Sequence, residues 1–226
     1  MIQITSFAQR ETLMELAAER VAEVLNQAIS QRGEGFAALS GGATPAPAYA
    51  ELARLRVNWP SVTFMLVDER FAPPQHPASN EGMLRRELMP ALARGAKLLP
   101  LYSEATTTDE AAAAAEDVYR GKPIDIAVMG MGNDGHTASW FPGSPQLADA
   151  LAPANPLTVM AVLAEGAAGT AARLTMTRAA LDRAGEVLLL ITGDEKRALL
   201  QDPRRGPLPV DALFDLSAHT QAIWAP

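Results

Sequence analysis

Residues 124–144 read IDIAVMGMGNDGHTASWFPGS, and the first six of them form a short, mainly apolar run that ends at Gly130. A short, partly β-branched apolar run bounded by glycine is typical of a buried parallel strand. We therefore expect a strand over residues 124–129 that leads into a loop. Ligands of open α/β sheets bind beyond the carboxyl ends of the strands, so a functional site is expected at this loop.

The loop carries Asp134 and His136, which are separated by one glycine, Gly135. In a locally extended segment residues i and i+2 project to the same side, and glycine permits torsions that a side chain forbids. We expect His136 to act as a general base near neutral pH, with Asp134 or another carboxylate fixing its tautomer. A lone loop histidine is more often a plain surface residue, but the nearby glycines and the aspartate favour the catalytic interpretation.

The glycines of residues 130–135 also match the pattern Gly-x-Gly-x-x-Gly of dinucleotide-binding loops. That fingerprint opens a helix after the first strand of a βαβ unit, and an acidic residue ends the next strand roughly 20 residues further on. Here the motif lies past the middle of the chain, and Pro142 interrupts the segment after it. The next strand-like run, residues 158–163, supplies only Glu165 beyond its end. The sequence therefore disfavours a nicotinamide cofactor.

The composition narrows the possible classes of protein. At 226 residues the chain is long enough for one α/β domain, and we expect residues 1–226 to form a single domain. Without cysteine there is no disulfide, thiolate nucleophile or cysteine-ligated metal, and the three histidines lack metal-ligand spacing. The net charge of −7 argues against nonspecific nucleic-acid binding. We expect a small-molecule ligand, with no nucleic-acid partner and no metal.

The first 21 residues mix charges into an amphipathic pattern, unlike the positive start and apolar block of a signal peptide. No run approaches the roughly 20 apolar residues that are needed to cross a bilayer. We therefore expect a cytoplasmic protein without a membrane partner. For its oligomeric state we expect a monomer or small homo-oligomer.

Strand-like and helix-like segments alternate along the chain. The apolar spacing predicts helices over residues 12–30, 45–56, 80–93, 108–120 and 194–201. It predicts strands over residues 36–39, 62–67, 97–101, 124–129, 158–163, 174–177 and 187–191. This alternation indicates an α/β fold with an open, largely parallel sheet that helices cover on both faces.

The predicted strand over residues 36–39 is followed by Ser40, Gly41, Gly42, Ala43 and Thr44. Thr44 is a good N-cap and the next residue is a proline that suits a first helical turn, so a helix is expected to start here. Free backbone N–H groups at this point would form an anion site. On its own, the segment is equally compatible with a plain strand-to-helix turn.

Basic side chains near other strand ends favour the anion site. Arg70 follows the strand over residues 62–67 together with Asp68 and Glu69, and Lys196 follows the strand over residues 187–191. Arg173 just precedes a predicted strand. Several cations around one sheet edge in a negatively charged protein indicate a site for a phosphorylated ligand.

Five segments of the chain together resemble the bacterial-type 6-phosphogluconolactonases, in the superfamily of the glucosamine/galactosamine-6-phosphate isomerases. They are SGGATP at 40–45, DERFAPPQHPASN at 68–80, GMGNDGHTASWFPGS at 130–144, RLTMT at 173–177 and TGDEK at 192–196. The resemblance implies a Rossmann-like sheet and hydrolysis of 6-phospho-D-glucono-1,5-lactone to 6-phosphogluconate, the second step of the pentose phosphate pathway. It also implies that no metal or organic cofactor takes part.

By this resemblance His136 is the base, Asp134 its partner, and Arg70 and Lys196 phosphate ligands. The full set of candidate substrate-binding residues is Ser40, Gly41, Gly42, Thr44, Asp68, Arg70, Asn80, Arg173 and Lys196. Asp68, Glu69 and Asn80 could each be catalytic, ligand-binding or structural, and the sequence slightly favours structural roles. We expect backbone N–H groups of residues 130–135 to meet the oxyanion.

Two other functions remain open at this point. The related deaminases resemble one another in a tyrosine after the Asp-Glu pair and a glutamate five positions after the histidine, where this chain has Arg70 and Phe141. These differences favour the lactonase. A non-catalytic sugar-phosphate sensor would keep the anion site but has no need of Asp134 beside His136.

Overall fold

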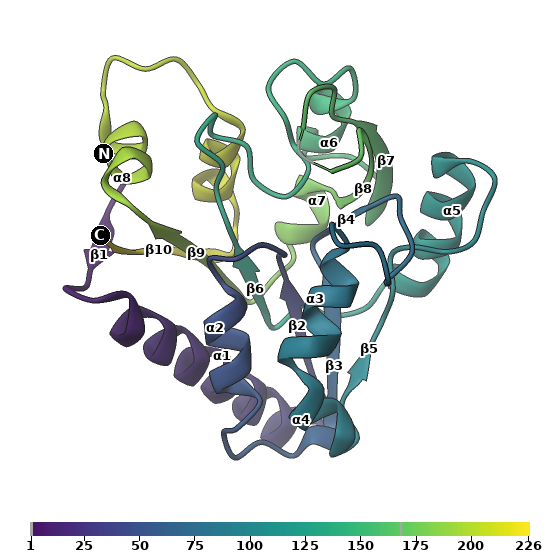
Figure 1. Cartoon of the computed structure of the whole chain (residues 1–226), viewed down its shortest axis with the longest axis vertical. Helices are drawn as coiled ribbons and strands as arrows, with labels where there is room; N and C mark the ends of the chain where they lie inside the picture. The colour runs from purple at the N-terminus through teal and green to yellow at the C-terminus, as the bar shows by residue number, and fades with distance from the viewer. Residues whose placement is uncertain (1, 168) are drawn as a thin grey trace.

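The computed structural model describes residues 2–167 and 169–226, and its main sheet has seven parallel strands (Figure 1). In spatial order the strands are β1 (Ile4–Ser6), β10 (His219–Ala225), β9 (Glu186–Thr192), β6 (Ile126–Met129), β2 (Gly35–Leu39), β3 (Val62–Leu66) and β5 (Lys97–Leu98). The predicted open, parallel α/β sheet is confirmed. The edge strand β1 and its neighbour β10 were not predicted, and β5 is shorter than the strand expected over residues 97–101.

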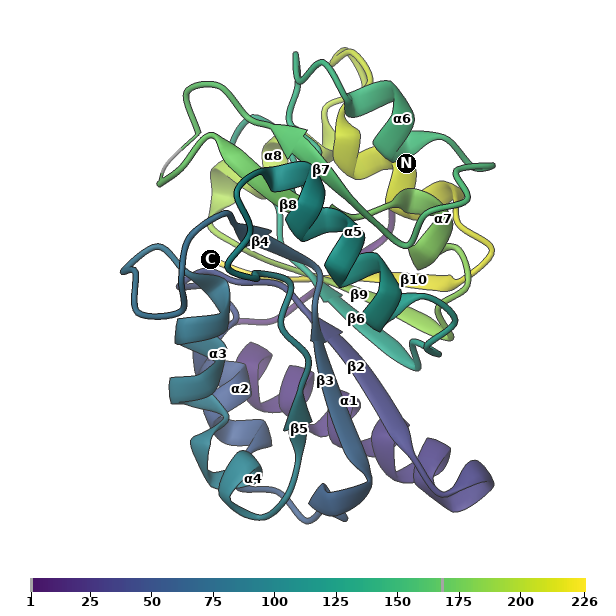
Figure 2. The ribbon, with the colours of Figure 1, turned by 90° about the vertical axis from the view of Figure 1, so that its right-hand side faces the viewer.

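Helices lie on both sides of this sheet, as predicted. They are α1 (Arg10–Arg32), α2 (Ala46–Leu52), α3 (Asn80–Glu87), α4 (Met89–Ala93), α5 (Thr108–Tyr119), α6 (Leu147–Leu151), α7 (Arg178–Leu181) and α8 (Asp194–Gln201), with 3₁₀ turns η1 (Trp59–Ser61) and η2 (Pro209–Asp215). The longest, α1, contacts β2, β6, β9 and β10. Figures 1 and 2 show α1 and α5 on opposite sides of the main sheet.

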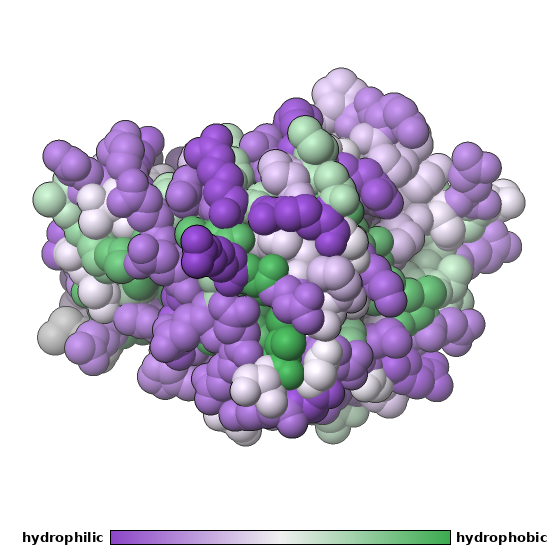
Figure 3. Space-filling model, turned by 90° about the horizontal axis from the view of Figure 1, so that it is seen from below, coloured by the Kyte–Doolittle hydropathy of each residue, from purple (hydrophilic) through white to green (hydrophobic). Residues whose placement is uncertain are grey.

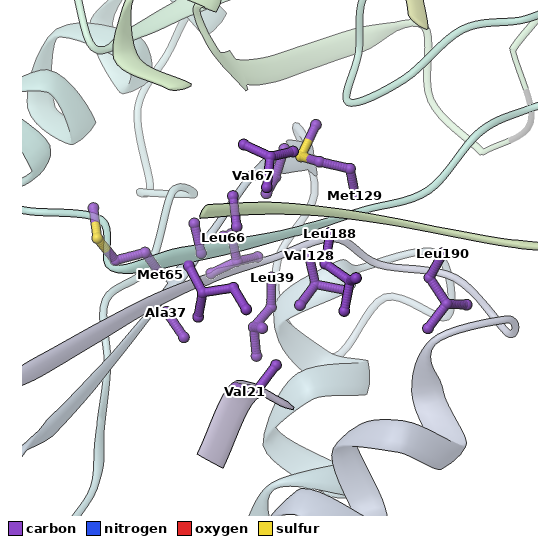
Figure 4. Packing of buried hydrophobic residues seen from close by; sticks show 14 of the residues in the cluster. Val21, Ala37, Leu39, Met65, Leu66, Val67, Val128, Met129, Leu188 and Leu190 are labelled. Atoms are coloured by element: carbon purple, nitrogen blue, oxygen red, sulfur yellow. The ribbon is translucent and has the colours of Figure 1, made fainter. Parts of the chain in front are cut away.

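Buried side chains from four adjacent strands form a row across the α1 side of the sheet. The strand register aligns Leu66, Leu39, Val128 and Leu188, and each is at most 2% exposed. Figure 4 shows Val21 of α1 close to Leu39 on this side. Burying a leucine or valine contributes about 1.5–3 kcal/mol, so the row fixes the register of the central strands.

A second, antiparallel sheet lies beside the main one, and the sequence did not predict it. Its strands are β4 (Asp68–Arg70), β8 (Ala172–Met176) and β7 (Val159–Leu163). The chain crosses between the sheets at Val67, whose N–H donates to Leu39 in the main sheet and whose carbonyl accepts from Met176 of β8. The predicted strands near residues 158–163 and 174–177 therefore exist, but they belong to this small sheet.

Two predicted helices are shorter than expected. The helix expected over residues 45–56 is α2, which ends at Leu52. The helix expected over residues 80–93 is divided into α3 and α4 at Leu88. Pro90 suits the first turn of α4 but has no N–H to continue a helix that runs through it.

None of the helices in the described part of the chain could span a membrane, because none is both long and apolar enough to cross a bilayer. On the face that Figure 3 shows, hydrophilic residues predominate and hydrophobic residues form only small patches.

Candidate active site

The order of the main sheet reverses between β2 and β6. From β2 the chain proceeds outward through β3 and β5, whereas from β6 it proceeds through β9 and β10 on the other side. Loops after the strands on either side of such a reversal diverge and leave a crevice at the carboxyl ends of the strands. The two glycine-rich loops of the sequence come directly after these two strands.

A pocket of about 230 Å³ lies at this crevice. Every predicted substrate-binding residue lines it, together with His136: Ser40, Gly41, Gly42, Thr44, Asp68, Arg70, Asn80, Arg173 and Lys196. Asp134 does not line the pocket but contacts His136. A larger hollow of about 580 Å³, between α5 and β7, contains none of these residues. The small pocket is therefore the candidate active site.

His136 and Asp134 form a pair at one side of this pocket. The His136 Nδ1 atom lies 2.5 Å from Asp134 Oδ1. They meet in a turn, in which Gly132 N–H donates to the His136 carbonyl and Gly135 N–H to that of Gly132. The extended geometry expected for this segment was wrong, although Gly135 does adopt a φ of +80° that favours glycine. Within residues 2–167 and 169–226, His136 Nε2 has no hydrogen-bond partner and is the ring nitrogen left for a ligand.

The carboxylate of Asp134 is suited to remain ionised beside the imidazole. Partial burial disfavours its charge, but the hydrogen bonds from the ring and backbone N–H of His136 outweigh this effect. The pKa of Asp134 is therefore below its ordinary value. An ionised Asp134 would hold the Nδ1 proton and direct the basic lone pair to Nε2.

Two residues that sequence reasoning missed fix the place of the His136 ring. A Cβ at Gly132 would lie 2.2 Å from ring atoms Nδ1 and Cε1, so only glycine leaves room for the ring. Phe141 stacks on the ring, with centroids 4.1 Å apart. The glycines of the sequence indicated a loop at this place. They did not indicate that residue 132 must be glycine, because that requirement comes from the position of the His136 ring in the folded protein.

The loop after β2 forms the opposite wall of the pocket. A Cβ at Gly41 would lie 1.8 Å from Asn80 Oδ1, and Gly42 has a φ of +108°. The amides of Gly41, Gly42 and Ala43 make no hydrogen bond with any described residue. Thr44 is not the N-cap that the sequence predicted, because the capping position is Pro45 and α2 starts at Ala46. The glycines, rather than a Thr44 cap, make backbone donors available here.

Arg70 and Arg173 lie directly opposite each other in the ladder of β4 and β8. Arg173 is only 2% exposed, and both its burial and the charge of Arg70 lower its pKa. The sequence placed Arg173 just before a strand, but it lies inside β8. Lys196 reaches the same pocket from α8, and burial lowers its pKa as well. Three cations thus converge on one small cavity, which is the electrostatic requirement for an anion site.

The acidic residues after β3 have different environments. Asp68 lines the pocket, accepts from Ser139 Oγ at 2.7 Å and lies 3.3 Å from Asn80 Nδ2. Glu69 is fully buried, and its carboxylate accepts from Arg70 N–H, Ser79 Oγ and the first two amides of α3. These contacts give Glu69 a structural role, because its carboxyl group satisfies the free amides at the N-terminus of α3.

Glu69 should make the stability of the fold depend on pH. Burial raises the pKa of Glu69 from the ordinary 4.5 to about 7, although four donors oppose the rise. Between these pH values the folded chain holds the proton more tightly than the unfolded chain, so the free energy of unfolding should fall as pH rises, by up to about 3 kcal/mol. Urea unfolding at pH 5, 6, 7 and 8 should show this fall, and Glu69→Gln should largely remove it. Parallel profiles for the two proteins would contradict the assignment.

Fold and pocket together define the class of protein: an open parallel α/β protein with a small, cation-lined pocket and a His–Asp pair at its switch point. Among the described residues, no group of three or more His, Asp or Glu side chains could hold a metal ion. The chain belongs to the family of glucosamine-6-phosphate isomerases/6-phosphogluconolactonase, whose model matches residues 8–224.

Individual relatives agree with this assignment along nearly the whole chain. A protein of Mesorhizobium japonicum named 6-phosphogluconolactonase is 38% identical, over 98% of this chain and 94% of its own. One of the same name from Caulobacter vibrioides is 39% identical, over 99% and 97% of the two chains. The crystal structure of a 6-phosphogluconolactonase from Shewanella baltica superimposes with a TM-score of 0.92 at 27% identity, covering 100% of this chain and 98% of the other.

Proposed function

We propose that this chain is an enzyme that hydrolyses 6-phospho-D-glucono-1,5-lactone to 6-phosphogluconate, in the oxidative branch of the pentose phosphate pathway. One observation carries the proposal: the paired His136 and Asp134 share a pocket of about 230 Å³ with Arg70, Arg173 and Lys196. This arrangement suits a ligand that carries an anionic group and, close to it, a bond that can be hydrolysed. Relatives that match nearly the full length are named for this reaction.

In the proposed mechanism the three cations and the free amides of the β2 loop hold the 6-phosphate, which brings the lactone carbonyl next to His136. His136 Nε2 removes a proton from a water molecule as the water oxygen bonds to C1. The C1–ring oxygen bond then breaks, and the imidazolium returns its proton to that oxygen. Asp134 stabilises the imidazolium through the Nδ1 proton. No cofactor is needed for these steps.

Two of the backbone donors expected to meet the oxyanion already have partners within the protein. Gly132 and Gly135 use their N–H groups inside the turn. Gly130 and Met131 both line the pocket, and their N–H groups have no partner within the described ranges, so we assign the oxyanion contact to these two residues.

The family description also covers glucosamine-6-phosphate isomerases, so deamination is the alternative activity. Two residues disfavour deamination. The related deaminases carry tyrosine and glutamate at the positions of Arg70 and Phe141. The purified chain should form 6-phosphogluconate from the lactone well above the spontaneous rate, read by a coupled dehydrogenase assay. It should release no ammonia from glucosamine 6-phosphate. Ammonia release would favour the deaminase, and binding of 6-phosphogluconate without turnover of either substrate would favour a sensor.

Lys196 provides a test of phosphate binding that is separate from folding. It makes no ion pair with any residue that the structure describes, and burial already disfavours its charge. Lys196→Met should therefore leave the free energy of unfolding unchanged or slightly higher. Hydrogen bonds to charged groups contribute about 1.5–3 kcal/mol, so KM for the lactone should rise about 10- to 100-fold, with a smaller change in kcat.

The matched control for this variant is Lys122→Met, which removes the same charge from an exposed position. Both variants should unfold at similar urea concentrations, and only Lys196→Met should change KM. An unchanged KM in Lys196→Met would exclude Lys196 from the phosphate site.

Three further properties of the enzyme are proposed from its sequence: its number of domains, its location and its oligomeric state. The enzyme would act as a single domain over residues 1–226, in the cytoplasm, as a monomer or small homo-oligomer. Sedimentation equilibrium of the active protein measures the oligomeric state directly, and a single unfolding transition would agree with one domain.

A further inference from the structure

Phe141 contacts two functional groups that come from different sheets. Its ring stacks on His136 at a centroid distance of 4.1 Å and an interplanar angle of 25°. The Arg173 guanidinium lies over the same phenyl ring, 5.6 Å from its centroid. His136 lies in the loop after β6 of the main sheet, whereas Arg173 belongs to β8 of the small sheet. The phenyl ring is therefore a physical link between the proposed base and a proposed phosphate ligand.

The segment that leads to Phe141 is attached to both sheets. Thr137 Oγ1 donates to the carbonyl of Gly130, directly after β6. Ser139 Oγ donates to Asp68 of β4, and Trp140 Nε1 donates to the Met176 carbonyl of β8. Trp140 is fully buried, so the residue before Phe141 has little freedom to move.

The backbone of this segment is also strained. Ala138 has a φ of +49°, which is uncommon for a residue other than glycine. Such a conformation is energetically unfavourable and persists only where the surroundings enforce it. The hydrogen bonds on either side of Ala138 provide that enforcement, and the strained turn delivers Phe141 to a defined place at the pocket.

We propose that Phe141 is a positioning residue that holds the His136 imidazole at a fixed distance and angle from the Arg173 guanidinium. The inference rests on the proposed function, because it assigns the two groups to opposite ends of one substrate. Stacking on the phenyl ring fixes the plane of the His136 imidazole. The hydrogen bond between Nδ1 and Asp134 fixes the direction of the Nδ1 atom within that plane. Arg173 gains a cation–π contact with the same ring. The stacked ring thus sets the separation between the base and the phosphate ligand.

The test compares Phe141→Leu, which keeps an apolar side chain but removes the ring, with Phe141→Tyr, which keeps the ring. Misplacing a base by a fraction of an ångström is expected to lower kcat about tenfold in Phe141→Leu. The inhibition constant of 6-phosphogluconate should rise a few-fold as Arg173 loosens. Phe141→Tyr should restore both values to near those of the parent. Phe214→Leu, outside the pocket, is the control for loss of a half-buried phenyl ring.

A spectroscopic measurement separates positioning from general stability. The chain has only three histidines, so ¹⁵N-detected imidazole signals can be assigned to His136 by comparison with His136→Ala. Phe141→Leu should move the His136 signals, whereas Phe214→Leu should leave the His136 signals in place.

Wild-type kcat and unshifted His136 signals in a folded Phe141→Leu variant would overturn the inference. If the parent protein itself fails to hydrolyse the lactone above the spontaneous rate, the proposed function fails instead. The imidazole signals and 6-phosphogluconate binding then still show whether Phe141 positions the two groups.

Discussion

Replacing His136 by alanine should lower kcat for the lactone by about 10²- to 10⁴-fold, which is the contribution that a general base typically makes. KM should change little, because the cations that hold the phosphate remain in place. The residual rate should reflect substrate positioning and hydrogen bonding to the oxyanion. Initial rates, corrected for spontaneous hydrolysis at each pH, measure both parameters.

Two comparisons make the result for His136 specific. His219→Ala removes an exposed histidine of β10 and should leave kcat unchanged. Added imidazole should restore part of the activity of His136→Ala, since it can enter the vacated space beside Asp134 and Phe141, but should have no effect on the parent enzyme. Near-normal turnover in His136→Ala would rule out the proposed base.

The central strands could be predicted because each depends on its own residues. The apolar runs of β2, β3, β6 and β9 are almost completely buried, and glycine comes within two residues of the end of β2, β6 and β9. Since the strands are parallel, their carboxyl ends meet at one edge. This is why the sequence could place Lys196 and His136 at the same site, and both line the pocket.

The small sheet could not be predicted, because its stability depends on contacts between distant segments. β4 consists of Asp68, Glu69 and Arg70, a sequence with poor strand propensity. It forms because Glu69 is satisfied by α3 and because Arg70 pairs in register with Arg173. The sequence could suggest that both arginines bind an anion, but not that they are direct neighbours.

The glycines of the His136 loop show the same limit on a smaller scale. The positive φ of Gly135 agrees with the freedom that the sequence analysis assigned to it. No positive φ explains Gly132, which is required only because the imidazole of His136 folds back over it. A local sequence pattern can indicate where the chain turns. It does not show which side chain will occupy the space next to a glycine in the folded protein.

Because the His136 ring lies so close to Gly132, even one added methyl group there should impair catalysis. Gly132→Ala should lower kcat about 100-fold although every proposed catalytic side chain is still present. The new methyl group would lie 2.2 Å from the His136 ring and 2.7 Å from Asp134 Oδ1, so the pair must move. A displacement of about 1 Å is enough for a loss of this size. The atoms that must move are the ends of side chains, and alanine also restricts the unfolded chain, so stability should change by less than about 1 kcal/mol.

The control for Gly132→Ala is Gly206→Ala, where a Cβ would meet open space and φ is not positive. Urea unfolding should place both variants close to the parent, while initial rates should show the loss of kcat only in Gly132→Ala. The imidazole signals of His136 should shift in the same variant, which would connect the lost activity to the displaced ring. If Gly132→Ala keeps its activity with the His136 signals moved, the position of this imidazole does not control the reaction and the proposed base is wrong.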